Sequence, residues 1–348
     1  MDPKKLSQEQ REEHEIYALG DFKLANGSIL PDAKIAYKTW GTLDAKRSNA
    51  IVYPTWYSGR HWENDWLIGP DMALNPEKYF IIVPNMFGNG LSSSPSNMPA
   101  PLDGPRFPEI SVLDNVTAQH CLVTEKFGIT SLVAVLGWSM GAGQTFQWAV
   151  SYPEMVPKIL PFCGSARTSD HNKVFLEGVK AALTADATYN GGNYSPDDKP
   201  IVGLKAFGRV YAGWGLSQPF YWHQMWRKLG FKSLDDFLVN FWEQFFVPKD
   251  PNNLLCMLST WSRGNIGNTP GFEGSLEKAL ASIKAKAMVM PAKIDLYFPV
   301  ADEEYEVSHM PNAQLRVIPG IWGHFAGGGA WDEDTAFIDK ALQELLDA

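Results

Sequence analysis

Residues 132–152 read LVAVLGWSMGAGQTFQWAVSY, and this stretch indicates the fold. An apolar run from Leu132 to Leu136 is followed by GWSMG at residues 137–141 and then by a stretch of helical character. Glycines on both sides of Ser139 permit a sharp strand-to-helix turn, which lifts the serine hydroxyl out of a sheet and aims the helix N-terminus at it. The pattern predicts that Ser139 is a nucleophile; the alternative is a chance Gly/Ser turn after a buried strand.

Strand-like apolar runs recur along the chain, and most are separated by segments long enough for helices. This alternation predicts an α/β fold with a mainly parallel central sheet and helices on both faces. An amphipathic helix is expected over residues 114–127, and a closing helix over 332–346. The strand-like runs lie at residues 33–39, 50–55, 79–84, 132–136, 159–162, 287–291 and 314–319.

From about residue 166 to residue 275 the chain has helical periodicity and is rich in Trp, Tyr and Phe. We interpret this block as a helical lid inserted between two parts of one catalytic core, residues 1–165 and 276–348. Its aromatic content predicts that some of its side chains line a substrate pocket, although aromatic residues at helical spacing usually form core. Trp214 and Trp222 of the lid and Trp56 of the core are the candidate substrate contacts.

Charge and cysteine content narrow the class of protein. The 30 basic and 39 acidic residues give a net charge of −9 without a basic cluster, which argues against nucleic acid or anionic membrane as a partner. Cys121, Cys163 and Cys256 lack metal-ligand or CxxC spacing and predict free thiols in a reducing, cytoplasmic setting. The N-terminal stretch is charged throughout, and no run approaches the roughly 18 apolar residues of a membrane span.

A serine hydroxyl becomes a good nucleophile only when a histidine takes its proton. In α/β-hydrolases the order along the chain is nucleophile, acid, histidine, each on a loop after a strand. Of the four histidines after Ser139, His324 in GIWGHF directly follows a predicted strand, so we assign it as the base. His171 and His223 fall in the lid, and His309 falls on an expected helix.

The histidine in turn needs an acid to hold its tautomer and to stabilise the imidazolium. Asp295 in KIDLYFP follows the strand-like run that includes Met288 and Met290, which favours it as the acid. Asp302 and, more distantly, Asp170 are the competing assignments. The alternative role for Asp295 is a turn aspartate that caps the helix starting near residue 300.

The oxyanion of a tetrahedral intermediate needs two N–H donors that are already in position. The backbone N–H of Met140, directly after the nucleophile, supplies one of them. The second is expected from the loop PTWYSGRH at residues 54–61, where Tyr57 is our choice and Trp56 the neighbouring alternative. No HExxH, paired His/Cys or GxxxxGK pattern is present, so we expect neither a metal nor a bound cofactor.

With these residues assigned, the chain resembles the homoserine O-acetyltransferase family of α/β-hydrolase-fold enzymes over nearly its whole length. The resemblance implies that Ser139, Asp295 and His324 form the catalytic triad, that acyl transfer runs through a serine ester, and that the lid also forms a homodimer interface. The similar segments are GWSMGAGQ at 137–144, NPEKYFIIVPNMFGNGLSSS at 75–94, FPEISVLDNVTAQHCLVTEKFGI at 107–129, YNGGNYS at 189–195, DLYFP at 295–299 and GH at 323–324.

The chain departs from that family where the amino-acid acceptor would bind. Members that use homoserine have an arginine in a lid motif like TYRS and an aspartate directly after the base histidine. Here Leu216 and Phe325 stand at those positions, and the oxyanion loop reads WYSG where the family has an ALTG-like sequence. A charged acceptor needs counter-charges, because burying an unpaired charge is costly. The departures therefore argue against homoserine as the acceptor.

The retained triad and the missing acceptor anchors predict a serine hydrolase that cleaves a small to medium hydrophobic ester or lactone. The alternative is an O-acyltransferase that moves acetyl from acetyl-CoA, as a co-substrate, to an alcohol other than homoserine. A noncatalytic receptor on the same fold is a third reading, but it would require a broken triad. A carboxylate nucleophile, as dehalogenation needs, is absent from the turn at Ser139.

Overall fold

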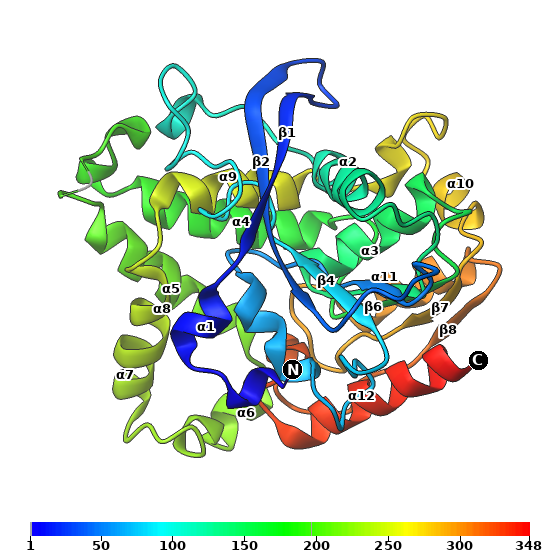
Figure 1. The fold of residues 1–348 in the computed structure, drawn as a ribbon. Coiled ribbons are helices and arrows are strands. Elements are labelled where there is room, and N and C mark those ends of the chain that lie inside the picture. Colours follow the sequence, from blue (N-terminus) through cyan, green and yellow to red (C-terminus); the bar gives the residue numbers. More distant parts are fainter. Residues whose placement is uncertain (1, 196) are drawn as a thin grey trace.

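A twisted sheet of eight strands runs through the molecule, with helices packed on both of its faces (Figure 1). The computed structural model describes residues 2–195 and 197–348. The strand order is β1-β2-β4-β3-β5-β6-β7-β8; β1 and β2 pair antiparallel to their neighbours, and β4, β3 and β5–β8 are parallel. This confirms the predicted α/β fold. The strands are β1 (Glu15–Lys23), β2 (Ile29–Trp40), β3 (Ala50–Val52), β4 (Phe80–Pro84), β5 (Ala134–Trp138), β6 (Lys158–Phe162), β7 (Lys286–Val289) and β8 (Ala313–Leu315).

The N-terminal strand β1 was not expected from the sequence, and it pairs with β2 in a long hairpin (Figure 1). Its residues are mostly exposed, so it lacks the apolar run that marks a buried strand. β2 also begins at Ile29, four residues before the expected strand. The remaining expected strands are present, with ends that differ by up to four residues.

Alternation along the central strand β5 divides the core into two parts. Ala134 and Leu136 point into one hydrophobic cluster with Leu342 and Leu345 of the C-terminal helix, whereas Val135 points into a second cluster with Val116. Because successive strand residues face opposite sides of a sheet, this apolar run is buried on both faces. The sheet is therefore covered by helices on both sides, as the sequence predicts.

Twelve α-helices lie within the described residues. The expected amphipathic helix over 114–127 corresponds to α2 and a π-helical turn that continues it to Lys126, and the expected closing helix corresponds to α12. Their bounds are α1 (Gln8–Glu12), α2 (Val112–Cys121), α3 (Met140–Ser151), α4 (Asp170–Thr184), α5 (Ile201–Gly215), α6 (Gln218–Trp222), α7 (Leu234–Phe237), α8 (Gln244–Phe246), α9 (Pro251–Ser262), α10 (Leu276–Ala281), α11 (Val300–Ser308) and α12 (Asp332–Asp347).

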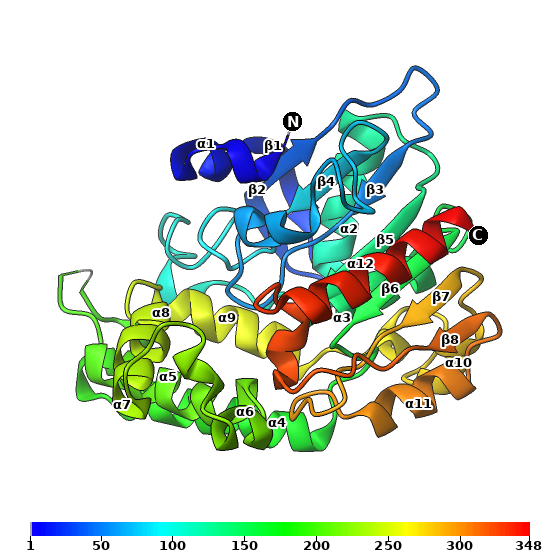
Figure 2. The same cartoon turned by 90° about the horizontal axis from the view of Figure 1, so that it is seen from below.

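The chain between β6 and β7 carries helices α4 to α10. Figure 2 shows α4 to α9, green to yellow, gathered beside the sheet, while α12, in red, runs across it. This helical segment contains the block that the sequence predicts as a lid, and its boundaries at residues 166 and 275 stay a prediction. None of the helices within the described residues has the length and hydropathy that crossing a bilayer requires.

Candidate active site

Ser139 lies at the turn between β5 and α3, in a backbone conformation that few side chains adopt. Its φ and ψ are 57° and −124°. A positive φ is strained in a non-glycine residue, so the surrounding structure must hold Ser139 in this conformation. A Cβ built on Gly137 would lie 2.3 Å from the carbonyl oxygen of Gly141, and one built on Gly164 would lie 2.4 Å from the carbonyl oxygen of Ser139. The turn is therefore closed only because these positions carry no side chain.

His324 and Asp295 complete a chain of hydrogen bonds that starts at this serine. The His324 Nε2 atom lies 2.9 Å from Ser139 Oγ, and its Nδ1 atom lies 2.7 Å from Asp295 Oδ2. Asp295 follows β7, and His324 lies in the short helical turn Gly323–Gly327 after β8. All three side chains are buried. The structure thus brings together the three residues that the sequence singled out from distant parts of the chain.

The competing residues lie elsewhere. Asp170, at the start of α4, pairs with Lys173 at 3.0 Å, and the carboxyl of Asp302 belongs to α11. The His171 ring packs against Trp214 with 5.0 Å between ring centroids, while His309 contacts the carbonyl of Tyr305. Of the candidate acids, only Asp295 is hydrogen-bonded to the imidazole that reaches Ser139.

The backbone around Asp295 fixes the orientation of its carboxylate. Its Oδ1 atom accepts hydrogen bonds from the N–H groups of Tyr297 at 2.8 Å and Phe298 at 3.2 Å. The other oxygen, Oδ2, is left for His324. Hydrogen bonds from two backbone donors hold the carboxylate in one orientation. These contacts form a turn within the DLYFP segment. The Asp295 side chain therefore combines a turn contact with the position expected of the predicted acid.

Trp138, which sequence analysis did not single out, also contacts His324. Its indole N–H donates to the His324 carbonyl oxygen at 3.2 Å, and its ring stacks on the imidazole with 5.1 Å between centroids. Trp138 directly precedes Ser139 in the GWSMG segment. Its place in that motif was the available signal, but only the fold shows that its ring turns toward residue 324.

Tyr57 and Met140, the two predicted oxyanion donors, each line a cavity that reaches Ser139. Within the described residues, neither the Tyr57 N–H nor the Met140 N–H donates to a backbone acceptor. The Tyr57 side chain is buried, and its hydroxyl donates to the Leu254 carbonyl at 3.1 Å. The next residue, Ser58, has a φ of 59°. The loop thus presents free N–H groups near the serine while its side chains are anchored elsewhere.

Two small cavities meet at Ser139. One, of about 30 Å³, lies between the oxyanion loop and His324 and is bounded by Trp56, Tyr57 and Phe325. The other, of about 20 Å³, lies on the far side of the serine against Met140 and Trp261. A single water needs about 10–15 Å³ of such space, so each cavity accommodates a group of only a few atoms.

A larger apolar chamber of about 360 Å³ adjoins the first cavity. The two share Trp56, Trp138, Phe245 and Phe325 as walls. Leu216 also lines this chamber, and it is buried. The two positions at which the family resemblance would place homoserine-binding charges, 216 and 325, therefore lie in one cavity, and both carry hydrocarbon side chains here.

The three predicted aromatic contacts have different positions. Trp56 lines both the small cavity at Ser139 and the apolar chamber. Trp214 is half-buried and stacks on Tyr297 with 6.4 Å between centroids, and it lines neither of the two Ser139 cavities. Trp222 is 83% exposed and likewise lines neither. These positions favour Trp56 as a substrate contact and give no such support to Trp214 and Trp222.

Two buried glutamates of α11, Glu303 and Glu306, form an acidic cluster. Burial raises the pKa of Glu303 well above its usual range, with further contributions from Glu306 and Asp295. Burial likewise raises the pKa of Glu306 to about 8, although the Ala166 N–H donates to it. Glu306 is therefore largely neutral at mildly acidic pH.

Comparison with known proteins identifies the family to which this chain belongs. The family of α/β-hydrolase-fold proteins matches residues 53–199. An ethyl acetate hydrolase from Pseudomonas veronii is 40% identical over 333 residues, covering 95% of each chain. A homoserine O-acetyltransferase from Chlorobium chlorochromatii is 28% identical over 313 residues, covering 86% of this chain and 87% of its own.

Among solved structures, an acetylester hydrolase from Corynebacterium glutamicum superposes with a TM-score of 0.95 at 38% identity, covering 98% of each chain. These similarities extend over the core and the helical segment alike. They confirm the resemblance to the homoserine O-acetyltransferases and show a greater likeness to esterases. The chain therefore belongs to the α/β-hydrolase family, in the group that contains these esterases and the related homoserine O-acetyltransferases.

Proposed function

We propose that the protein is a serine hydrolase that cleaves esters of short carboxylic acids with apolar alcohols. The observation that carries this proposal is the hydrogen-bond chain from Ser139 through His324 to Asp295, set beside a cavity of only about 30 Å³. The relatives named as an ethyl acetate hydrolase and an acetylester hydrolase, at about 40% identity, confirm the broader prediction of a serine ester hydrolase.

In the proposed reaction His324 Nε2 takes the proton of Ser139 while Oγ attacks the ester carbonyl carbon. Asp295 stabilises the imidazolium, and the Tyr57 and Met140 N–H groups donate to the developing oxyanion. Collapse of the tetrahedral intermediate breaks the bond to the alcohol, which leaves with the proton from His324. Water then attacks the acyl-serine in the same way and releases the carboxylic acid.

The sizes and lining of the cavities support the assignment of the two halves of the ester. The small cavity at Ser139 has room for about two or three water-sized groups, which suits an acetyl group. Positions 216 and 325 of the apolar chamber carry hydrocarbon side chains, so they offer no counter-charge to a charged alcohol. This lining suits a hydrocarbon alcohol. Trp56 and Phe325, which line both spaces, would contact the ester at the bond that breaks.

Acetyl transfer from acetyl-CoA to another alcohol is the second candidate, and the greater similarity to esterases favours it less. It requires an acyl-enzyme that survives until the acceptor arrives. Its distinguishing outcome is acylation of Ser139 by acetyl-CoA that persists until an alcohol is added. Rapid turnover of p-nitrophenyl acetate without acylation by acetyl-CoA supports hydrolysis, and mass spectrometry of the intact protein separates the two.

The experiment that tests the proposal is a chain-length series of p-nitrophenyl esters from acetate to octanoate. We expect kcat/KM to fall at least tenfold from acetate to octanoate, since the longer acyl chain exceeds the cavity. Ser139→Ala is expected to remove nearly all turnover, and Ser308→Ala, an exposed serine on α11, serves as the matched control. Retained turnover in Ser139→Ala would disprove the assigned nucleophile, and a rate that rises with chain length would disprove the assigned acyl group.

We also infer a homodimer formed through the predicted lid and a cytoplasmic location. Exposed apolar side chains concentrate in the lid segment and include Val174, Val202 and Trp222, which supports a covered surface there. The three cysteines are free thiols, which supports a reducing compartment. Sedimentation of the purified protein tests the first inference, and its cellular fractionation tests the second.

A further inference from the structure

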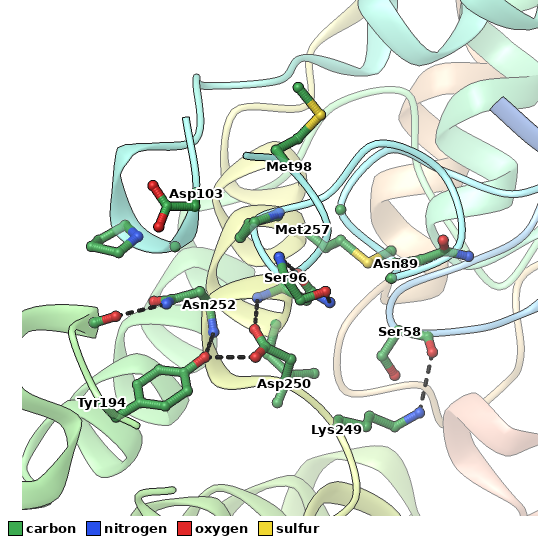
Figure 3. Close-up of a pocket in the computed structure, with 18 of the residues that line it drawn as sticks. Ser58, Asn89, Ser96, Met98, Asp103, Tyr194, Lys249, Asp250, Asn252 and Met257 are labelled. Carbon is green, nitrogen blue, oxygen red and sulfur yellow. Dashed lines mark hydrogen bonds between the residues drawn. The ribbon is translucent and has the colours of Figure 1, made fainter. Parts of the chain in front are cut away.

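A large polar cleft opens on the other side of the oxyanion loop from the apolar chamber. It has a volume of about 770 Å³ and lies between the loop after β4, the segment around Tyr194 and the start of α9 (Figure 3). Its inner end reaches Ser58, which also lines the small cavity at Ser139. The cleft is thus a separate space that shares one wall residue with the proposed active site.

The charge of this polar cleft is opposite to that of the protein. Four cationic side chains, Arg60, Arg106, Lys199 and Lys249, and two carboxylates line it, although the chain as a whole carries a charge of −9. Both carboxylates are engaged locally. Asp103 pairs with Arg106 at 2.7 Å, and Asp250 accepts from the Tyr194 hydroxyl at 2.7 Å and from the N–H of Asn253 at 2.9 Å.

Two of the cations that line the cleft, Lys249 and Arg60, belong to different segments of the chain. The Lys249 ammonium donates to the Ser58 carbonyl at 3.1 Å (Figure 3). It also lies 4.3 Å from the centre of the Phe245 ring. Its contacts within the described residues are thus a carbonyl and an aromatic face, not a carboxylate. Burial lowers the pKa of Lys249; the negative charge of Glu63 opposes this effect, and the positive charge of Arg60 adds a smaller lowering.

The Arg60 guanidinium likewise forms no ion pair within the described residues, although the Arg60 backbone N–H donates to the Glu63 carboxylate at 2.8 Å. Its guanidinium lies over the ring of Trp62, 5.3 Å from the centroid, and beside Gly90, which is another wall of the cleft. Holding two like charges in one cleft, partly removed from water, is costly. An anion between them would offset that cost, because an arginine fork and an ammonium both donate strongly to oxyanions.

We propose that the polar cleft is an anion-binding site, in which Arg60 and Lys249 hold a carboxylate or phosphate group. The shared chemistry is an oxyanion, and the volume leaves room for a larger molecule attached to it. A carboxylate could be the acid that the proposed reaction releases, whereas a phosphate would mark a different ligand. The site rests on the cleft and its charges and does not depend on the proposed esterase activity.

The test is binding of acetate and of inorganic phosphate to the full-length protein at constant ionic strength, with chloride as the balancing ion. Saturation-transfer NMR follows acetate, and the ³¹P linewidth follows phosphate. We expect saturable binding of at least one anion, weakened at least tenfold in Arg60→Met and in Lys249→Met. Lys249→Arg, which keeps the charge, is expected to retain binding, and Lys286→Met, an exposed lysine on β7, is the matched control.

The same titrations on Ser139→Ala separate this site from the proposed active site. Binding that persists in Ser139→Ala but is lost in the two cleft variants supports the anion site whatever the catalytic outcome. Binding of acetate alone identifies a carboxylate site, and binding of phosphate identifies a site for phosphorylated ligands. No saturable binding of either anion, or equal binding by the wild type and both cleft variants, would overturn the proposal.

Discussion

The indole N–H of Trp138 donates to the backbone carbonyl of His324 at 3.2 Å, and the two rings stack with 26° between their planes. The residue before the proposed nucleophile therefore positions the proposed base. Trp138→Phe keeps an aromatic ring but removes the donor. A hydrogen bond of this kind contributes about 1 kcal/mol, so we expect kcat to fall on the order of fivefold with the fold unchanged.

Steady-state kinetics with p-nitrophenyl acetate measure this effect, and Trp222→Phe on the exposed lid surface is the control. A slower rate of Ser139 labelling by a fluorophosphonate should accompany the lower kcat, because both reactions use the same base. Unchanged kinetics in Trp138→Phe would show that His324 is held by its other contacts.

Glycine 137 is expected to tolerate no side chain. A Cβ there would lie 2.3 Å from the Gly141 carbonyl oxygen, and neither backbone segment can move without opening the turn at Ser139. We expect Gly137→Ala to destabilise the protein by about 3 kcal/mol or more. Thermal unfolding measures this. The contrasting control is Gly178→Ala on α4, where a Cβ meets nothing within 4 Å and a small gain of about 0.5–1 kcal/mol is expected.

Phe325 is expected to set the polarity of the alcohol that is accepted. Phe325→Asp places a carboxylate on the wall shared by the apolar chamber and the Ser139 cavity. Arg11, the one cation among the described residues that line the chamber, is already paired with Asp65 at 2.8 Å. We expect kcat/KM for butyl acetate to fall at least tenfold, whereas Phe325→Leu keeps most of it. If the two variants lose activity equally, the shape of Phe325 matters and the polarity of the wall does not.

The buried acids of α11 predict a pH dependence of stability. Glu306 has an ordinary pKa of 4.5 and a folded-state pKa of about 8, so between these values the folded state holds a proton that the unfolded state has released. Stability is therefore full below about pH 4.5 and is lost as pH rises toward 8, by at most about 1.4 kcal/mol per pH unit.

Melting temperatures between pH 5 and pH 8 test this dependence. Glu306→Gln removes the ionisation but keeps an oxygen that can accept from the Ala166 N–H, so its melting temperature should fall less over this range. Glu304→Gln, an exposed neighbour on the same helix, should behave as the wild type does. Identical slopes for all three proteins would contradict the buried-acid explanation.

The exposed indole of Trp222 predicts an interface. With 83% of its surface exposed in the single chain, it is an unusual residue for a solvent-facing helix, and Val202 at 74% lies in the same predicted lid. We expect Trp222→Glu to convert a dimer into a monomer in light scattering, with Lys228→Glu on the same segment as a charge control. A wild-type protein that is monomeric at micromolar concentration would exclude the proposed dimer.

Much of the site could be predicted because its chemistry imposes strict local sequence patterns. The turn at Ser139 needs glycines at fixed spacing, and His324 and Asp295 each follow a recognisable apolar strand. Contacts made by side chains across the fold carry no such local pattern. The stacking of Trp138 on His324, the exposure of Trp222 and the meeting of Leu216 with Phe325 in one chamber depend on packing between distant segments.

The strand β1 illustrates the same limit for the fold. Its only buried residue is Phe22, so alternation of apolar and polar residues gives little signal, and its pairing with β2 decides its conformation. By contrast, the residues of β5 are buried on both faces of the sheet and read as a strand from composition alone.

The supports of the loop at residues 54–61 limit how this enzyme could be re-engineered. The Tyr57 hydroxyl and the Ser58 carbonyl are both held by residues between β6 and β7, namely Leu254 and Lys249. Exchange of this helical segment with that of a relative, in order to import a new substrate preference, would also replace the supports of the loop. A functional chimera would therefore have to carry a compatible pair at positions 249 and 254 along with the new pocket.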